Sequence, residues 1–347
     1  MTPTAWSLTH AKLHTFLRKH ILLPRDSRVL MAVSGGQDSL CLARLLLDMQ
    51  KHWQWSLAIA HCDHRWRPDS ADNADYVKQL AEQWQIPCWV EVAQTPVESE
   101  AAARSWRYET LAKLADLHGY EYVVTGHTGS DRAETVLYNL IRGTGLKGLG
   151  TLSWKRPLNS QASSISLVRP LLNFSREETG KFCQQQGIRP WEDSSNQTLT
   201  FRRNRIRLEL LPYLKEHFNP QVERSLIQMA ESVELDMQYI EEQARDLYER
   251  LVIERNGFEW RVGDRYELKE GCCWEINQSA LQSAPAALRK RVAKRLLQVA
   301  LPKPPSFRHI EKLVALANAP NRTKSDPFPG NLIAEVRKPA IVLYSLP

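Results

Sequence analysis

The chain has 347 residues, of which 43% are hydrophobic and 24% are charged, and its formal net charge is +7. This length exceeds what one hydrophobic core usually organises, so we expect two domains with the composition of an ordinary soluble protein. No apolar stretch approaches the ~20 residues of a membrane span and no signal-peptide core is visible, which excludes membrane and secreted classes and predicts a cytoplasmic location. Six cysteines without a CxxC pair predict reduced thiols and disfavour a zinc or iron–sulfur site.

After a leading helix at 8–22, strand and helix patterns alternate. Continuous apolar runs at 29–33, 55–61, 87–93 and 120–124 predict buried parallel strands, and helical patterns separate them. This alternation predicts an α/β fold with a doubly wound parallel sheet, because the crossover helices then cover both faces. Ligands of such sheets bind beyond the carboxyl ends of the strands, so the turns that follow the strands are the candidate site.

The turn after the first strand has the sequence SGGQDS. Gly35 and Gly36 allow backbone N–H groups to approach an anion, and Ser34 and Ser39 add hydroxyl donors beside the N-terminus of the next helix. An ordinary glycine turn is the alternative, but the serines and the aspartate favour a phosphate site. The predicted pyrophosphate-binding residues are Ser34, Gly35, Gly36, Gln37, Asp38 and Ser39. Asp38 would repel bound phosphates unless a cation lay between them, so we interpret it as a Mg²⁺ ligand.

Two other loop types can be excluded. The loop lacks both the GxxxxGK[ST] pattern of Walker-type nucleotide sites and the GxGxxG pattern of dinucleotide sites. SGGQDS instead resembles the pyrophosphate loop of N-type ATP pyrophosphatases. Those enzymes split ATP between its α and β phosphates and leave an adenylated substrate, so the resemblance implies ATP without choosing the second substrate.

Further polar residues follow the other strands. His61 and His64 lie at the end of the second strand, where they would contact nucleotide or substrate; a metal site would need a third ligand. His127 follows the fourth strand. Asp131 and Glu134 come next, and they either form a helix-capping box or bind a cationic substrate or a metal.

A pair of arginines and two basic segments complete the candidates. Arg104 and Arg107 share one helix face, where they either clamp phosphate or form a salt-bridged surface. A basic stretch with nearby Phe201 and Trp191 suits RNA, with structural contacts as the alternative. Its basic residues are Arg202, Arg203, Arg205 and Arg207. A second candidate is the basic helix at 286–300, which we expect to bury Leu288, Val292, Leu296 and Val299 while presenting Lys290, Arg291 and Lys294.

The remainder of the chain predicts a long helix and a small terminal domain. Apolar residues recur at spacings of three and four from 222 to 251, which predicts a core-facing seam or a homodimer interface. Short strand-like runs at 258–262, 272–276, 333–336 and 341–344, together with the basic helix, predict a small α+β domain.

Taken together, the motifs resemble those of the tRNA(Ile)-lysidine synthetase family. SGGQDS, HCDHRWR, EAAARSWRYETL, TGHTGSDRAETVL, RPLL and WEDSSN followed by FRRNRIR occur in the family's order between about residues 25 and 215. The resemblance implies an adenine nucleotide alpha hydrolase-like, PP-loop catalytic domain at 1–215 and a helical linker with a tRNA-binding domain at 216–347. This chain departs from the family at three positions. Family members often carry Asp where this chain has Ser130, Gly where it has Arg65 and Pro where it has Ser194.

The resemblance also implies a reaction. ATP, with Mg²⁺, activates C2 of the wobble cytidine, position 34, of isoleucine tRNA with a CAU anticodon. Free L-lysine then displaces AMP to give lysidine, which changes the identity of the tRNA from methionine to isoleucine. We expect Asp38, Arg104, Arg107, His127 and Asp131 to serve catalysis. Asp131 and Glu134 would recognise lysine, with His61, His64, His127 or a carboxylate as candidates for the base.

Two other functions remain as alternatives. A related pyrophosphatase such as a tRNA thiolase would use the same loop, but it typically needs paired catalytic cysteines or a cluster-binding CxxC, and neither spacing is present. A non-enzymatic RNA-binding protein with an inactive nucleotide fold is the second alternative. The presence of Asp38, His127 and Asp131 argues against it.

Overall fold

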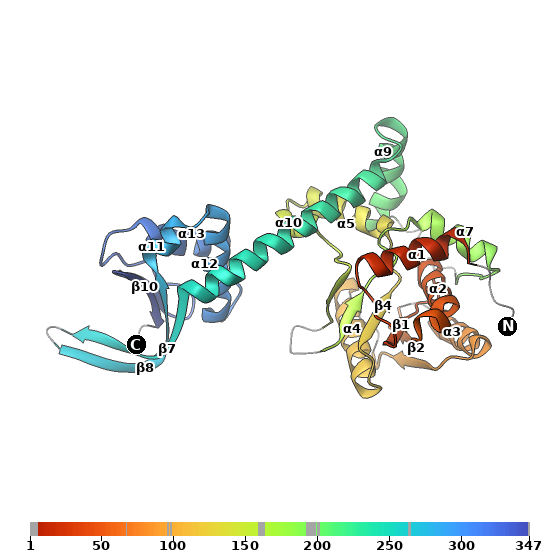
Figure 1. The fold of residues 1–347 in the computed structure, drawn as a ribbon, viewed down its shortest axis with the longest axis horizontal. Coiled ribbons are helices and arrows are strands. Elements are labelled where there is room, and N and C mark those ends of the chain that lie inside the picture. The colour runs from red at the N-terminus through yellow and green to blue at the C-terminus, as the bar shows by residue number, and fades with distance from the viewer. Residues whose placement is uncertain are drawn as a thin grey trace. The chain divides into compact units, whose positions relative to one another are not determined.

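The computed structural model describes residues 6–66, 68–95, 97, 99–158, 164–191, 199, 202–262 and 265–345. The segment WEDSSN, including Ser194, and Phe201 lie mostly or wholly outside the described residues. The chain forms two compact units, Met1–Glu234 and Leu235–Pro347, so the first unit extends beyond the predicted boundary at residue 215. Figure 1 shows the elements of both units.

The first unit contains a six-stranded sheet and helices that connect its strands. Its elements through the third strand are α1 (Leu8–Lys19), β1 (Arg28–Ala32), α2 (Gln37–Trp53), β2 (Ser56–Asp63), α3 (Ser70–Trp84) and β3 (Cys88–Val92). There follow α4 (Glu100–Leu117), β4 (Tyr122–Thr125), α5 (Gly129–Ile141), α6 (Leu146–Leu149), β5 (Lys155–Pro157) and β6 (Ser166–Val168). The unit continues through α7 (Arg176–Gln185), α8 (Arg202–Arg205), the π-helix η2 (Ile206–Leu210), α9 (Leu211–His217) and the first part of α10 (Val222–Leu251).

The sheet is doubly wound, as the alternating pattern predicted. Its strand order is β3-β2-β1-β4-β6-β5, and all neighbouring pairs are parallel except β5 with β6. Successive side chains of a strand point to opposite faces, which explains why β1 is apolar throughout. Val29 and Met31 belong to the hydrophobic core that α1, α2, α3 and α7 also line, whereas Leu30 belongs to the core that α4 lines.

The strand order reverses at β1. The chain runs outward from β1 through β2 to β3 and then returns to place β4 on the other side of β1. The carboxyl ends of β1 and β4 therefore flank the topological switch point, where open α/β sheets bind ligands. The turn after β4 approaches the start of α2 so closely that only glycine fits at residue 126. A Cβ on Gly126 would lie 2.7 Å from the backbone nitrogen of Ser39.

The second unit has a four-stranded antiparallel sheet with helices packed against it. Its elements are β7 (Val252–Val262), β8 (Arg265–Asn277), α11 (Gln278–Ser283), α12 (Ala286–Ala300), α13 (Phe307–Ala315), the 3₁₀ turn η3 (Leu316–Asn318), β9 (Leu332–Arg337) and β10 (Ala340–Ser345). The strand order is β7-β8-β10-β9. Val292 and Leu296 of α12 are fully buried, but the prediction for Val299 was wrong because its side chain is 59% exposed. Ala293 and Leu297 complete the buried stripe instead.

Helix α10 has 30 residues and is amphipathic, as the spacing of its apolar residues predicted. Ala230, Ala244 and Leu251 are buried, whereas Leu235 and Tyr239 are more than half exposed. In the described part of the chain, no helix combines the length and the apolar character required to cross a membrane.

Candidate active site

The phosphate loop, residues 34–39, is braced by Asn73 and Trp191. Asn73 was not among the predicted site residues, and Trp191 was predicted to contact RNA rather than the loop. Gly35 has φ +83, and a Cβ there would lie 2.2 Å from Oδ1 of Asn73. The amide of Asn73 donates to the carbonyl of Ser34 at 3.0 Å, and the Trp191 N–H donates to the carbonyl of Gly35 at 2.9 Å. These two contacts from outside the loop fix the carbonyls of Ser34 and Gly35 and so hold the shape of the loop.

The two serines of the loop bond to the loop itself. Ser39 Oγ donates to the carbonyl of Gly36 at 2.8 Å and accepts from the Ser34 N–H at 3.2 Å. Gln37 points elsewhere, since its side-chain amide donates to the Arg176 carbonyl at 2.7 Å and to Thr179 Oγ1 at 2.9 Å. The Gln37 side chain therefore ties α2 to α7, and its contribution to the loop comes from its backbone.

Asp38 lies in the first turn of α2 and is only 9% exposed. Thr179 Oγ1 donates to its Oδ1 at 2.5 Å, and Arg176 Nε lies 3.6 Å from its Oδ2. Burial raises the pKa of Asp38 above its ordinary value, and nearby Asp131 raises it further, while Arg176 and Thr179 oppose the shift. Arg176 is the cation beside this buried carboxylate, and it approaches only one of the two oxygens. The Asp38 carboxylate could therefore also bind a divalent cation.

The donor set suits Mg²⁺ better than a metal that requires several protein ligands. Within the described residues, no group of three or more His, Cys, Asp or Glu side chains could hold a metal ion. Mg²⁺ needs only one or two carboxylates when phosphate oxygens and water complete its shell. Asp38 beside the phosphate loop provides that arrangement.

Asp131 and Glu134, the carboxylate pair, both begin α5 and face two arginines. The predicted capping box of Asp131 with Glu134 was wrong. Thr128 is the cap and Asp131 is its partner, because Asp131 Oδ2 accepts from the Thr128 N–H at 2.8 Å. Arg203 donates to Asp131 Oδ1 at 3.2 Å and to Glu134 Oε2 at 3.0 Å. Arg207 donates to both oxygens of Glu134, at 2.6 and 2.9 Å. Capping and ion pairing therefore occur together.

The four arginines of the predicted RNA-binding stretch divide into two pairs. Arg203 and Arg207 lie four residues apart and turn inward, where Glu134 is only 1% exposed between them. Arg202 and Arg205 are exposed. The prediction treated the four as one surface, and it missed this division because the partners of Arg203 and Arg207 lie about 70 residues away in the chain.

Arg104 and Arg107 belong to a larger arginine cluster around Tyr108. The guanidinium carbons of Arg104, Arg107 and Arg156 lie 5.2, 6.0 and 5.3 Å from the centre of the Tyr108 ring. Burial would raise the pKa of Tyr108, but Arg104, Arg169 and Arg107 lower it below its ordinary value. Among the described residues, no carboxylate forms an ion pair with any of these four arginines, so the cluster carries uncompensated positive charge that suits an anion.

His127 interacts electrostatically with both the arginine cluster and Asp131. Its Nδ1 shares a hydrogen bond of 2.8 Å with Thr125 Oγ1. Burial lowers the pKa of His127 to about 3, the charges of Arg169, Arg104 and Arg107 add to this shift, and Asp131 opposes it. His127 is therefore neutral at neutral pH and has a ring nitrogen that can accept a proton.

The depressed pKa of His127 makes stability fall on acidification. The unfolded chain takes up a proton on His127 near pH 6.5, whereas the folded chain does so only near pH 3, so this contribution is intact above pH 6.5 and is lost progressively below it. At about pH 5 the loss is about 2 kcal/mol. Urea unfolding at about pH 7.5 and 5 should show a smaller loss for His127→Gln than for the unmodified chain. Equal losses would contradict the neutral buried state.

The other two histidine candidates occupy different environments. His61 is buried, and its Nδ1 lies 2.8 Å from the carbonyl of Val33, immediately before the phosphate loop. The His64 ring packs 4.9 Å from the Trp66 ring. His61 therefore helps to position the loop, a role that the sequence pattern alone did not separate from substrate contact.

Ser130 and Arg65 stand where the resemblance led us to expect Asp and Gly. Ser130 Oγ donates to Glu223 of α10 and accepts from the Arg176 N–H at 3.0 Å. An aspartate there would face the Glu223 carboxylate, so serine suits this chain. Arg65 has φ +57, the left-handed region that glycine enters without strain.

In the second unit, two of the three basic residues predicted to bind tRNA form ion pairs. Lys290 Nζ lies 2.6 Å from Glu311, and Arg291 Nε lies 3.1 Å from Glu241. Lys294 forms no ion pair with any described residue. Exposed pairs contribute only ~0–1 kcal/mol, so the pair with Glu311 leaves Lys290 able to contact phosphate, whereas Arg291 is partly buried.

Comparison with known proteins gives the class. Residues 7–214 match the protein family described as the PP-loop domain. A U34-tRNA thiolase, NcsA from Methanococcus maripaludis, superposes with a TM-score of 0.54 at 18% identity, covering 65% of this chain and 77% of that one, which shows a shared fold. The fold and the phosphate loop therefore define a PP-loop nucleotide enzyme.

Curated relatives narrow the class. A tRNA(Ile)-lysidine synthase of Nostoc is 50% identical over 97% of both chains, and that of Synechocystis is 46% identical over 96% of both. The chain belongs to the tRNA(Ile)-lysidine synthase family. The predicted family and fold class are confirmed.

Proposed function

We propose that this chain joins lysine to C2 of the wobble cytidine, position 34, of isoleucine tRNA with a CAU anticodon. Lysidine formation on isoleucine tRNA is the activity for which the family is named, and tRNA, ATP and lysine are the substrates implied by that name. One observation supports the proposal above the others. The phosphate loop, Asp38 and the carboxylate pair meet at one switch point, so ATP and a cationic amine would lie side by side.

In the first step, the C2 oxygen of the cytidine attacks the α-phosphorus of ATP, an O–P bond forms and pyrophosphate leaves. The phosphate loop would bind the departing phosphates through its N–H groups. Mg²⁺ on Asp38 would supply charge neutralisation there. We propose that Arg104 and Arg107 stabilise the charge that grows on the α-phosphate, since the arginine cluster has no carboxylate of its own among the described residues.

In the second step, the lysine ε-amine attacks C2, the C–N bond forms and AMP leaves. At pH 7 only about one lysine in 10³ has a free amine, so a group near the amine must accept its proton. We propose that the carboxylate pair binds lysine while Arg203 and Arg207 hold its geometry. His127 is our first candidate for the base. Burial is the main cause of its low pKa, and bound phosphate would offset the smaller effect of the arginines. A carboxylate or His64 is the alternative.

The tRNA would be bound by cations of both units that are at least partly exposed. Arg202 and Arg205 in the first unit, and Lys290, Arg291 and Lys294 in the second, are the proposed contacts. Arg203 and Arg207 were also predicted to bind tRNA. We propose that they act on it indirectly, by positioning the carboxylate pair. The cytoplasm is the proposed location, and a homodimer through α10 stays a prediction.

Incorporation of labelled lysine tests the proposal. Unmodified isoleucine tRNA with a CAU anticodon should take up the label only when ATP and Mg²⁺ are present. The same tRNA with uridine in place of the wobble cytidine is the matched control and should take up none. AMP release on the cytidine tRNA without lysine uptake would refute lysine as the second substrate, and it would favour a related pyrophosphatase chemistry.

A further inference from the structure

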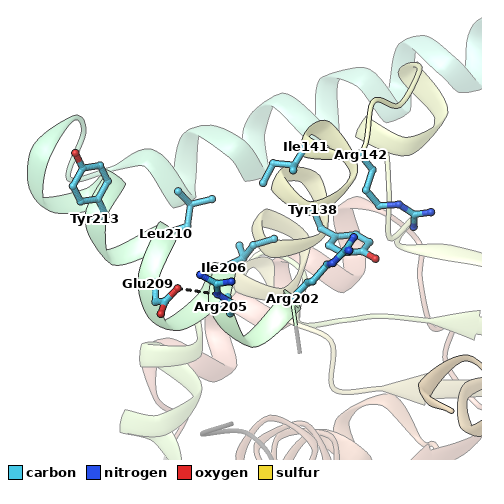
Figure 2. Close-up of a pocket in the computed structure, with 9 residues that line it drawn as sticks. All are labelled: Tyr138, Ile141, Arg142, Arg202, Arg205, Ile206, Glu209, Leu210 and Tyr213. Atoms are coloured by element: carbon cyan, nitrogen blue, oxygen red, sulfur yellow. Dashed lines mark hydrogen bonds and ion pairs between the residues drawn. The ribbon is translucent and has the colours of Figure 1, made fainter. Parts of the chain in front are cut away.

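The C-terminal half of α5 forms one wall of a cavity of about 610 Å³ (Figure 2). We call it the tyrosine pocket. Its lining residues are Tyr138, Ile141, Arg142, Arg202, Arg205, Ile206, Glu209, Leu210 and Tyr213. All of them lie within the first unit, on α5, α8, η2 and α9 or directly after α5. The cavity is large enough for a nucleobase and its ribose.

The walls of the tyrosine pocket are apolar and aromatic, and they are open to solvent. Ile141 is 67% exposed and Tyr213 is 53% exposed, so large apolar groups face water here. Exposed apolar groups that gather on a concave surface often mark a ligand-binding site. A flat aromatic ligand would cover them.

The rim carries positive charge. Arg142 lies with its guanidinium carbon 5.3 Å from the centre of the Tyr138 ring, and Arg205 pairs with Glu209 at 3.1 Å. Arg202 has no carboxylate partner among the described residues. Three arginines against one acid, together with two tyrosines, match a ligand with a π-face and a flanking phosphate, which is the composition of an unstacked nucleotide.

The tyrosine pocket adjoins the carboxylate pair along α5. Asp131, Glu134, Tyr138 and Ile141 follow one another at spacings of three and four residues, so they share one helix face. At 1.5 Å rise per residue, Tyr138 lies about 6 Å and Ile141 about 10 Å beyond Glu134 along the helix. In a stacked strand, neighbouring bases lie only ~3.4 Å apart, which is less than the distance from the carboxylate pair to the pocket. A base next to the reacting cytidine must therefore unstack to reach the pocket.

We propose that the tyrosine pocket binds the base next to the reacting cytidine, the adenosine at position 35 of the CAU anticodon, in an unstacked conformation. Binding this base would splay the anticodon loop and present C2 of the cytidine to the site at the switch point. The inference rests on the proposed function, because it takes the wobble cytidine as the reacting base. Tyr138 would stack on the adenine, and Arg142 and Arg202 would contact its flanking phosphates.

Fluorescence of 2-aminopurine placed at position 35 tests the proposal, because stacking on tyrosine changes its emission. With the unmodified chain, we expect a saturable change on binding of the substituted tRNA. Tyr138→Ala should reduce this change and raise the KM for tRNA about tenfold, with kcat altered less. Tyr138→Phe should retain both. The matched control Tyr239→Ala removes an exposed tyrosine of α10 outside the pocket and should leave both unchanged.

The outcomes separate this inference from the proposed function. If the unmodified chain incorporates lysine but Tyr138→Ala keeps the KM for tRNA and the fluorescence change, the tyrosine pocket has another occupant and the inference is overturned. An equal change with 2-aminopurine at position 33 would also overturn the assignment to position 35. Failure of lysine incorporation by the unmodified chain would instead contradict the proposed function. Thermal unfolding of each variant shows that a raised KM comes from a folded protein.

Discussion

Asp38→Asn should lower AMP release on tRNA by at least about 10²-fold, because the variant keeps the shape of the side chain but loses the charge that faces bound phosphates and their cation. The same variant should unfold at an unchanged or higher temperature. Burial and Asp131 already raise the pKa of Asp38, so its charged form costs the fold stability, and removing the charge relieves that cost. Activity and stability should thus move in different directions.

The matched control for this experiment is Asp116→Asn. Asp116 is exposed on α4, and its replacement makes the same chemical change away from the switch point. Pyrophosphate and AMP release should be measured over a range of Mg²⁺ concentrations. If Asp38→Asn releases AMP at the rate of Asp116→Asn, Asp38 does not act on the phosphates or their cation.

Asp131→Asn should separate the two halves of the reaction. Asparagine keeps an oxygen for the Thr128 N–H and so preserves the start of α5, but it removes the charge that faces Arg203 and a bound amine. Adenylate formation should change by less than about threefold, whereas lysine transfer should slow by about 10²-fold, the scale of losing one acid–base or charge contact. Rapid-quench kinetics with labelled ATP and labelled lysine measure the two steps separately.

The control for Asp131→Asn is Asp72→Asn, which changes another first-turn aspartate on an exposed helix start. Lysine transfer by Asp131→Asn at the rate of the unmodified chain would show that the carboxylate pair serves only to hold Arg203 and Arg207. A slow first step would instead place Asp131 with the phosphates, which its electrostatic contact with Asp38 makes the main competing explanation.

Much of the site was predictable because strand ends converge in a doubly wound sheet. Residues directly after β1 and β4, among them Asp38, His127 and Asp131, could be assigned to one crevice from strand order alone. The prediction was weaker for residues on the connecting helices. Arg104 and Arg107 were expected near phosphate, but nothing in the sequence indicated that Arg156 and Arg169 join them around Tyr108.

By itself, the sequence determined the alternation of strands and helices, the phosphate loop and the family, because each depends on local order along the chain. Only the tertiary structure decided which side chains, distant in the sequence, contact one another. Arg203 and Arg207 pair with Glu134 because α8 and η2 pack against α5. Asn73 and Trp191, from separate segments, bond to the carbonyls of Ser34 and Gly35. A charge run in sequence fixes how many cations are present, whereas packing fixes which of them are neutralised and which remain available to an anionic partner.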